Sequence, residues 1–162
     1  MKELKSVFSR EELTENAVKL LKKLIATPSM SRDEYNVSLI IEGFFNEHQI
    51  KVNRFKNNMW ATNKYSDAGK PTILLNTHHD TVKPNKAYTL DPFIPVEKDG
   101  KLFGLGSNDA GASLVAMAQT FLYFYEAEDL THNLVIALTA EEEISGLDGI
   151  EALFPQLPNV EL

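Results

Sequence analysis

The sequence contains no cysteine, which excludes disulfide bonds and metal sites built on thiolates. Any metal ion in this protein must therefore be held by histidine, aspartate or glutamate side chains. Positive charge is also scarce, because 16 Lys and Arg residues stand against 23 Asp and Glu residues, for a formal net charge of −7. This acidic balance argues against a surface that binds nucleic acid or an anionic membrane.

Long apolar runs are missing as well. No stretch of the sequence approaches the roughly 20 apolar residues of a membrane-spanning helix, and residues 1–5 lack the apolar core of a signal peptide. We therefore expect a cytoplasmic protein. The 162 residues are 43% hydrophobic and 24% charged, as is typical of one globular domain of ordinary size.

Apolar residues recur at helical spacing twice in the first part of the chain. Ser9-x-x-Glu12 has the capping-box pattern, and the apolar positions after it predict a helix that stops before Pro28. Ser31-x-x-Glu34 repeats that pattern. We therefore predict that a second helix begins with a second capping box.

Two apolar runs predict buried strands. Residues 72–77 (TILLNT) are predicted to be an interior strand, and residues 133–138 (NLVIAL) a second strand with both faces covered. A third helix is expected at residues 110–126, and Asp99-Gly100 is a strong hairpin signal. Strands that alternate with helices predict an α/β sandwich with a mostly parallel central sheet.

Residues 76–82 (NTHHDTV) leave the first of these strands. Residues two apart on an extended strand share a face, so His78 and Asp80 point the same way and His79 points the other way. An imidazole with a carboxylate at the end of a buried strand suits a divalent metal ion and an acid that orients its ligand. Taken alone the pattern is weak evidence, because His-x-Asp is common by chance.

Asp109 lies where the third helix begins, and two interpretations compete there. Asp commonly caps a helix at this position, which is the simpler interpretation. The nearby Gly104, Gly106 and Gly111 bring a dinucleotide loop to mind, but their spacing is wrong for that motif. A carboxylate would also repel the phosphate that such a loop binds.

Glu141, Glu142 and Glu143 form a short acidic run, which is usually a solvated turn. Here the run comes almost directly after the buried strand at residues 133–138. Carboxylates held together near a buried strand end repel each other and lose hydration, so they need a partner. Few basic residues lie nearby in the sequence, and a bound cation would resolve the conflict. In α/β folds, ligands bind beyond the carboxyl ends of the strands.

Three segments occur in register: His78-x-Asp80, GLGSNDAG at residues 104–111 and TAEEEISG at residues 139–146. Together they resemble the acetylornithine deacetylase and succinyl-diaminopimelate desuccinylase family of dinuclear zinc peptidases and amidohydrolases. The likeness covers nearly the whole chain, and residues 75–84 look closest to the acetylornithine deacetylase branch. The resemblance implies a zinc-peptidase-like three-layer α/β/α sandwich that binds two divalent metal ions, zinc or cobalt.

The resemblance also implies a role for each matching residue. His78, Asp109 and Glu143 would be metal ligands, with Asp109 bridging both ions. Asp80 would orient His78, and Glu142 would be the general base on the water between the ions. The family places a cis peptide bond just after the bridging aspartate. Neither His79 nor the first glutamate of the triplet is assigned a role.

Two departures from the family pattern stand out. The family often has Lys two residues after the bridging aspartate, where this chain has Gly111. Family chains are also much longer, and they supply a further acidic metal ligand and a histidine near their end. Neither Glu151 nor Glu161 matches that acidic ligand. We therefore interpret residues 1–162 as the N-terminal part of a catalytic domain, without the inserted dimerisation domain and the C-terminal part. Its metal site would be incomplete.

The function implied by the resemblance is removal of the acyl group from a small N-acyl amino acid. N-acetylornithine is favoured, which would place the protein in arginine biosynthesis, and the full-length protein is expected to be a homodimer through the inserted domain. Succinyl-diaminopimelate desuccinylase and a dipeptidase or carboxypeptidase stay open within the same class. A binding or assembly module that lost the reaction is a second class, which intact Asp109, Glu142 and Glu143 argue against. A nucleotide-binding domain is a third.

Overall fold

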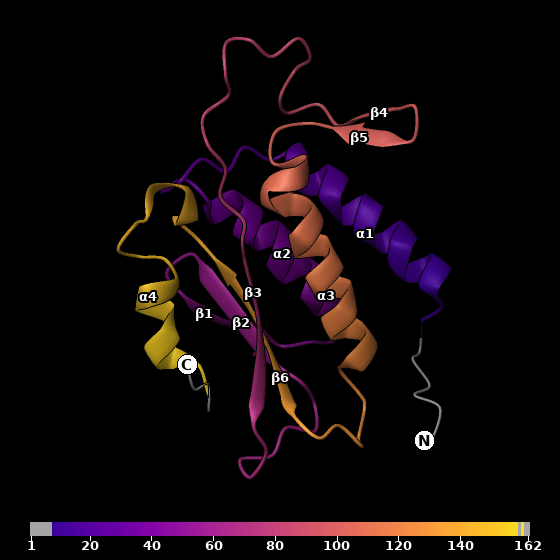
Figure 1. The fold of residues 1–162 in the computed structure, drawn as a ribbon, viewed down its shortest axis with the longest axis vertical. Helices are drawn as coiled ribbons and strands as arrows, with labels where there is room; N and C mark the ends of the chain where they lie inside the picture. Colours follow the sequence, from indigo (N-terminus) through magenta and orange to yellow (C-terminus); the bar gives the residue numbers. More distant parts are fainter. Residues whose placement is uncertain (1–7, 159, 161–162) are drawn as a thin grey trace.

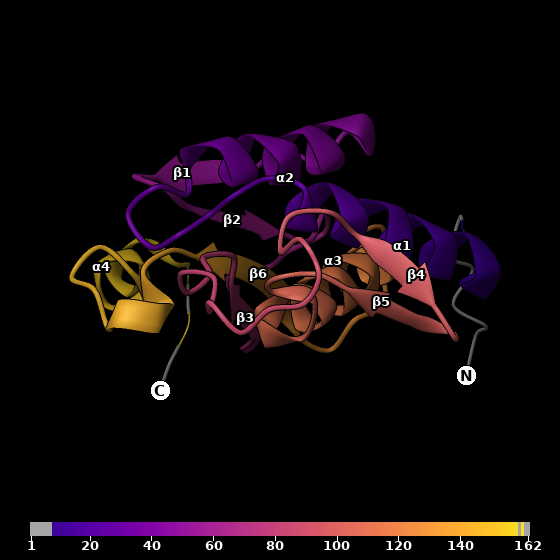
Figure 2. The same cartoon turned by 90° about the horizontal axis from the view of Figure 1, so that it is seen from above.

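The computed structural model describes residues 8–158 and residue 160. In chain order the elements are α1 (Arg10–Ile25), α2 (Tyr35–Glu47), β1 (Asn53–Phe55), β2 (Asn58–Thr62), β3 (Thr72–His78), β4 (Val96–Lys98), β5 (Lys101–Phe103), the π-helical segment η1 (Ser107–Ala112), α3 (Ser113–Phe124), β6 (Asn133–Thr139), the 3-10 turn η2 (Glu142–Ile144), α4 (Ile150–Leu153) and the 3-10 turn η3 (Phe154–Gln156). Helices α1, α2 and α3 lie on one side of the sheet and the short α4 on the other (Figures 1 and 2). The layered α/β/α class is thereby confirmed.

The four-stranded sheet has the order β1-β2-β6-β3. Only β3 and β6 are parallel, and the β1–β2 and β2–β6 pairs are antiparallel. The sheet is thus mixed, and the expectation of a mostly parallel sheet is wrong in this detail. A tight turn joins β1 to β2, which forces them to run antiparallel, whereas the connection between β3 and β6 contains helix α3 and permits parallel strands.

Strand β6 is buried at every position, as its apolar sequence predicts. The prediction that β3 is an interior strand is wrong for the described residues, because β3 lies at the sheet edge and Ile73 is 44% exposed. An apolar sequence indicates that the faces of a strand are covered. It does not indicate whether another strand pairs with each of its two edges. The register of the parallel pair places His78 opposite Thr139, so the carboxyl ends of both strands meet at one edge of the sheet.

The main core lies between the sheet and helices α1, α2 and α3. It contains buried side chains from every one of these layers, including Leu20, Leu24, Ile41, Phe45, Met59, Leu114, Phe121 and Ile136. Helix α1 begins at the predicted capping box, where Ser9 and Glu12 bond each other's backbone N–H groups at 3.2 and 2.8 Å. It ends at Ile25, before Pro28, as predicted.

The second predicted capping box does not form. Helix α2 begins at Tyr35, and Glu34 at its N-cap makes no side-chain cap hydrogen bond. Ser31 Oγ instead donates to Asp80 Oδ2 at 2.7 Å, and Glu34 Oε1 accepts from the backbone N–H of Glu141 at 3.3 Å. Partners that are distant in the sequence therefore replace the local cap, and they lie at the candidate site.

The hairpin predicted at Asp99-Gly100 is present between β4 and β5. The register places Lys98 opposite Lys101, so the loop has two residues, and both have positive φ, 51° and 71°. This is the conformation of a type I′ turn, which matches the twist of paired strands.

Two other expectations concern the ends of the chain and its apolar runs. We expect a further strand at residues 160–162, but residues 161 and 162 lie outside the described residues. Within the part of the chain that the structure describes, no helix combines the length and the apolar character needed to cross a membrane.

Candidate metal centre

His78 ends strand β3, and its ring lies between two groups of oxygen atoms. Nδ1 is 3.1 Å from the main-chain oxygen of Asp80 and 3.3 Å from Asp80 Oδ1. Nε2 is 3.2 Å from Asp109 Oδ1 and 3.7 Å from Glu142 Oε2. Asp80 thus occupies the Nδ1 side and leaves Nε2 to the acidic side chains. Histidines that bind metals are typically oriented by a carboxylate in this way.

The pKa values of His78 and Asp80 move in opposite directions. The hydrogen bond with Asp80 raises the pKa of His78 to about 9, against desolvation, which lowers it. Burial raises the pKa of Asp80, but hydrogen bonds from His78, Ser31 and the backbone N–H groups of Glu143 and Glu142 outweigh it and lower this pKa to about 2. The two shifts share one main cause, the contact between the imidazole of His78 and the buried carboxylate of Asp80.

The turn that follows β6 is held by its backbone. Glu141 has a φ of 56°, in the left-handed region, and turns the chain at the strand end. Four successive backbone N–H groups donate to side chains of buried residues. The bonds are Ala140 N to Asn58 Oδ1 at 2.9 Å, Glu141 N to Glu34 Oε1 at 3.3 Å, Glu142 N to Asp80 Oδ1 at 3.1 Å and Glu143 N to Asp80 Oδ2 at 3.2 Å.

The structure brings three of the predicted site residues together. His78, Asp109 and Glu143 each offer one ligand atom, and these three atoms lie within 4.8 Å of one another. The group forms at the carboxyl ends of β3 and β6, where an α/β fold places its ligands. The assignment of these residues as metal ligands stays a prediction.

Asp109 does not cap a helix. The N-cap of α3 is Ala112, which makes no side-chain cap hydrogen bond. Asp109 has the non-helical angles φ −115° and ψ 103°, and its peptide bond to Ala110 is cis, as the family resemblance implies. The capping interpretation is therefore wrong, and the Asp109 carboxylate faces His78 instead.

The acidic side chains around His78 lack a basic partner. Within residues 8–158 no Lys or Arg nitrogen lies within 4.0 Å of the carboxylates of Asp109, Glu142 or Glu143. Burial raises the pKa of Glu143, and repulsion from Asp109 raises it further. A divalent cation would remove this repulsion, and an imidazole with carboxylates is a donor set that zinc-like ions bind. The residues present fit a metal ion.

His79 takes no part in this group. It is buried, and neither ring nitrogen has a hydrogen-bond partner among the described residues. Burial lowers its pKa to about 4, so the ring is neutral at pH 7. Its side chain lines a small buried space together with Val37 and Leu114.

At Gly111, where the family often has Lys, the backbone leaves no room for a side chain. A Cβ atom at this position would lie 2.5 Å from the carbonyl oxygen of Gly106 and 2.6 Å from Leu21 Cδ1. Gly111 N also donates to that carbonyl oxygen at 2.9 Å. A lysine here would require the loop before α3 to move.

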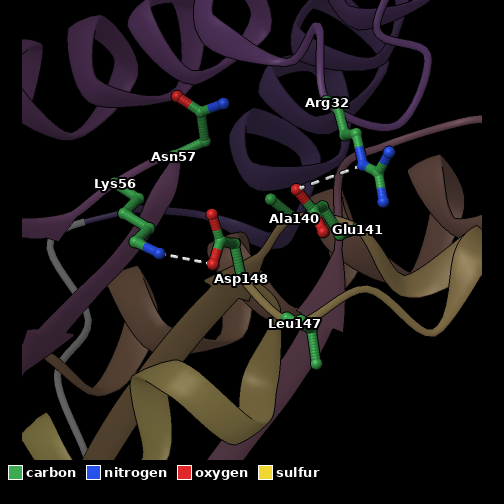
Figure 3. A pocket seen from close by; sticks show the side chains of 7 residues that line it. All are labelled: Arg32, Lys56, Asn57, Ala140, Glu141, Leu147 and Asp148. Atoms are coloured by element: carbon green, nitrogen blue, oxygen red, sulfur yellow. Dashed lines mark hydrogen bonds and ion pairs between the residues drawn. The ribbon is translucent and has the colours of Figure 1, made fainter.

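Two pockets border the turn at residues 140–143, here called the glutamate turn. One, of about 450 Å³, contains Arg32 and Lys56 (Figure 3). Both cations are paired there, Arg32 Nε with Glu141 Oε1 at 4.0 Å and Lys56 with Asp148, so the pocket carries no unpaired positive charge. The other, of about 480 Å³, is lined by His78 and Glu142 among others and therefore adjoins the candidate metal ligands.

Sequence reasoning missed three supporting residues, Ser31, Glu34 and Asn58. The sequence predicts that Ser31 and Glu34 form a helix cap and that Asn57-Asn58 forms a turn. Asn58 Nδ2 donates to the main-chain oxygen of Asp148 at 2.6 Å, so this buried amide ties Ala140, at the start of the glutamate turn, to Asp148. Besides any nearer contacts, each has a partner that lies 49 to 107 residues away, and no local pattern predicts such contacts.

The fold and the site define a class, an α/β/α domain in which an imidazole and carboxylates gather at the strand ends in a set that fits a divalent metal ion. The sequence profile of the peptidase family M20/M25/M40 matches residues 74–160, more than half of the chain. The chain belongs to this family.

Relatives of two names match the sequence. A succinyl-diaminopimelate desuccinylase of Sulfurovum sp. (strain NBC37-1) is 29% identical over 149 residues, which cover 91% of this chain and 39% of the relative. An acetylornithine deacetylase of Proteus mirabilis (strain HI4320) is 38% identical over 143 residues, which cover 79% of this chain and 36% of the relative. The chain thus spans well under half the length of these relatives, and the matches do not single out one branch.

Solved structures share the fold at low identity. Human carnosine dipeptidase 1 has a TM-score of 0.72 at 19% identity, covering 88% of this chain and 35% of that one. A dinuclear metal-binding peptidase of the M20 family from Bacillus subtilis has a TM-score of 0.70 at 18% identity, covering 94% and 42%. These likenesses place the described residues in the M20 peptidase fold.

Proposed function

We propose that the whole protein is a metal-dependent hydrolase of small N-acyl amino acids and that this chain carries part of its metal centre. The observation that supports the proposal is the group formed by His78, Asp109 and Glu143, whose ligand atoms lie within 4.8 Å. Its carboxylates have no Lys or Arg partner among the described residues. A purely structural acidic cluster would be expected to recruit a basic side chain.

Each residue of the group has a distinct part in the proposed chemistry. His78 Nε2, Asp109 and Glu143 hold the metal, while Asp80 accepts a hydrogen bond from His78 Nδ1 and fixes the ring. When bound, divalent ions such as zinc or cobalt polarise a carbonyl group and lower the pKa of water. Glu142 is 60% exposed and lies beside Nε2 of His78. It takes a proton from the attacking water and passes it to the leaving amine.

The proposed substrate is N-acetylornithine or a related N-acyl amino acid, and N-succinyl-diaminopimelate is the alternative because relatives of both names match. The pocket of about 480 Å³ beside His78 and Glu142 has a volume usual for small-molecule sites. The proposal includes a cytoplasmic homodimer that forms through a domain outside these residues.

The described residues bring together too few ligands for two metal ions. A tetrahedral zinc site takes about four ligands, whereas His78, Asp109 and Glu143 are the three that come together within the described residues. We therefore expect the isolated chain to bind metal weakly and to have no turnover. Full activity of the isolated chain, lost on chelation, would contradict this expectation.

The decisive assay compares two substrates in the whole protein. N-acetylornithine and N-succinyl-diaminopimelate are incubated with the enzyme as purified, after chelation, and after Zn²⁺ or Co²⁺ is restored. We expect hydrolysis of one substrate, loss on chelation and recovery with metal. A protein that retains metal but hydrolyses neither substrate, nor a panel of dipeptides, would instead be a binding or assembly module.

A further inference from the structure

One buried carboxyl group has no part in the chemistry proposed above. Glu34 is 0% exposed and makes no cap hydrogen bond to helix α2. Its oxygens accept from Arg32 N at 2.5 Å, Asn57 Nδ2 at 3.0 Å and Glu141 N at 3.3 Å. Within the described part of the chain, no Lys or Arg side chain pairs with it. Burying such a group is costly unless its hydrogen bonds are made.

The bond to Glu141 N is one of the row of four that holds the glutamate turn. Asp80 receives the next two N–H groups and Asn58 the one before. Glu141 is also the residue with the left-handed φ of 56°, a conformation that non-glycine residues keep only with support from their surroundings. Glu34 therefore acts at the point where the chain turns from β6 into the site.

The neighbouring glutamates depend on this backbone for their position. Within residues 8–158 the side chains of Glu142 and Glu143 accept no hydrogen bond and pair with no Lys or Arg. We propose that Glu34 is a positioning residue. By holding the N–H group of Glu141 it fixes the turn that presents Glu143 to His78 and Asp109. The metal-binding part of this role rests on the proposed function.

The role is tested first without metal, by amide hydrogen exchange at residues 141–143 of the 162-residue chain. Glu34→Asp keeps the charge but shortens the side chain by one methylene, so the carboxylate no longer reaches Glu141 N. Glu34→Gln keeps the length and one acceptor oxygen. We expect exchange to rise about tenfold or more in Glu34→Asp, because a hydrogen bond to a charged group is lost, and to stay near wild type in Glu34→Gln.

The matched control is Glu42→Asp, which shortens a carboxylate side chain within helix α2. Glu42 pairs with Arg54 at 2.7 Å rather than with a group of the glutamate turn. Its variant should leave exchange at residues 141–143 unchanged. Exchange in helix α3, measured in the same samples, reports any general loss of stability. Equal exchange at residues 141–143 in Glu34→Asp and wild type would overturn the proposal.

The second measurement is Co²⁺ affinity of the same variants. We expect Glu34→Asp to bind Co²⁺ about 10- to 100-fold more weakly than wild type, as is usual when support behind a ligand is lost. Faster exchange with unchanged Co²⁺ affinity would refute the positioning role. A wild-type chain that binds no Co²⁺ would contradict the metal centre itself, and the exchange result alone would then decide whether Glu34 holds the turn.

Discussion

The two sides of the glutamate turn differ in burial and in hydrogen bonding. On the supporting side, Asp80, Glu34 and Asn58 are buried and receive the N–H groups of residues 140–143. On the open side, the side chains of Asp109 and Glu142 are 77% and 60% exposed, and His78 is the one cationic group beside them among the described residues. The fold thus fixes the backbone while it leaves the outer carboxylate oxygens free for a ligand.

The largest effect is expected where one residue serves both sides. Asp80→Ala removes the partner of His78 Nδ1 and the acceptor of two N–H groups. Because a buried charged pair is broken, we expect the free energy of unfolding to fall by about 3–5 kcal/mol and Co²⁺ binding to be lost. Denaturant melts with Asp80→Asn as the conservative control measure this. A midpoint equal to that of wild type would show that Asp80 supports nothing.

Glu142→Gln tests the open side in the whole protein. Removing a general base is expected to slow hydrolysis by about 10²–10⁴-fold, while metal content and melting temperature stay near wild type, because the Glu142 side chain is 60% exposed and its partner His78 keeps its contact with Asp80. Glu128→Gln, an exposed change on a different part of the surface, is the control. Unchanged turnover in Glu142→Gln would refute the general-base assignment.

Gly111→Ala tests how tightly the loop that carries Asp109 is packed. The added Cβ would meet the Gly106 carbonyl oxygen and Leu21 Cδ1 at 2.5 and 2.6 Å, so we expect a loss of about 1–3 kcal/mol in the free energy of unfolding. Gly43→Ala is the matched control. A Cβ atom there would meet nothing within 4 Å, and alanine stabilises a helix interior by about 1 kcal/mol relative to glycine. Equal melting temperatures for both variants would contradict the close packing.

Arg32→Gln should have the smallest effect. The guanidinium is 74% exposed and lies 4.0 Å from Glu141 Oε1, and exposed ion pairs of this kind contribute about 0.5 kcal/mol or less. We expect thermal melts of the variant and of wild type to overlap closely. A large drop in melting temperature would mean that the ion pair between Arg32 and Glu141, drawn in Figure 3, supports the glutamate turn as strongly as the buried carboxylates do.

Local patterns predicted the parts of the fold that neighbours in sequence decide. The capping box at Ser9 and Glu12, the hairpin at Asp99-Gly100 and the buried β6 belong to this group. The same pattern at Ser31 and Glu34 misled, because partners 49 and 107 residues away compete for those side chains. Strand order and the edge position of β3 also depend on pairing between distant segments.

The candidate site was predictable to a different degree. Three motifs located His78, Asp109 and Glu143, and the structure brings these residues together. Their roles, and those of Asp80 and Glu142, stay predictions. The sequence does not identify Glu34 and Asn58 as supporting residues. A polar residue that is buried in the fold resembles a turn or cap residue until its distant partners are known.

Co²⁺ titration of the 162-residue chain, followed by visible absorption, tests whether His78, Asp109 and Glu143 bind a metal ion. We expect a weak, saturable Co²⁺ spectrum that is lost in Asp109→Asn and in Glu143→Gln and retained in Glu128→Gln, because only the first two remove a ligand. A spectrum that is absent from the wild-type chain, or identical in all four proteins, would contradict the assignment of His78, Asp109 and Glu143 to a metal centre.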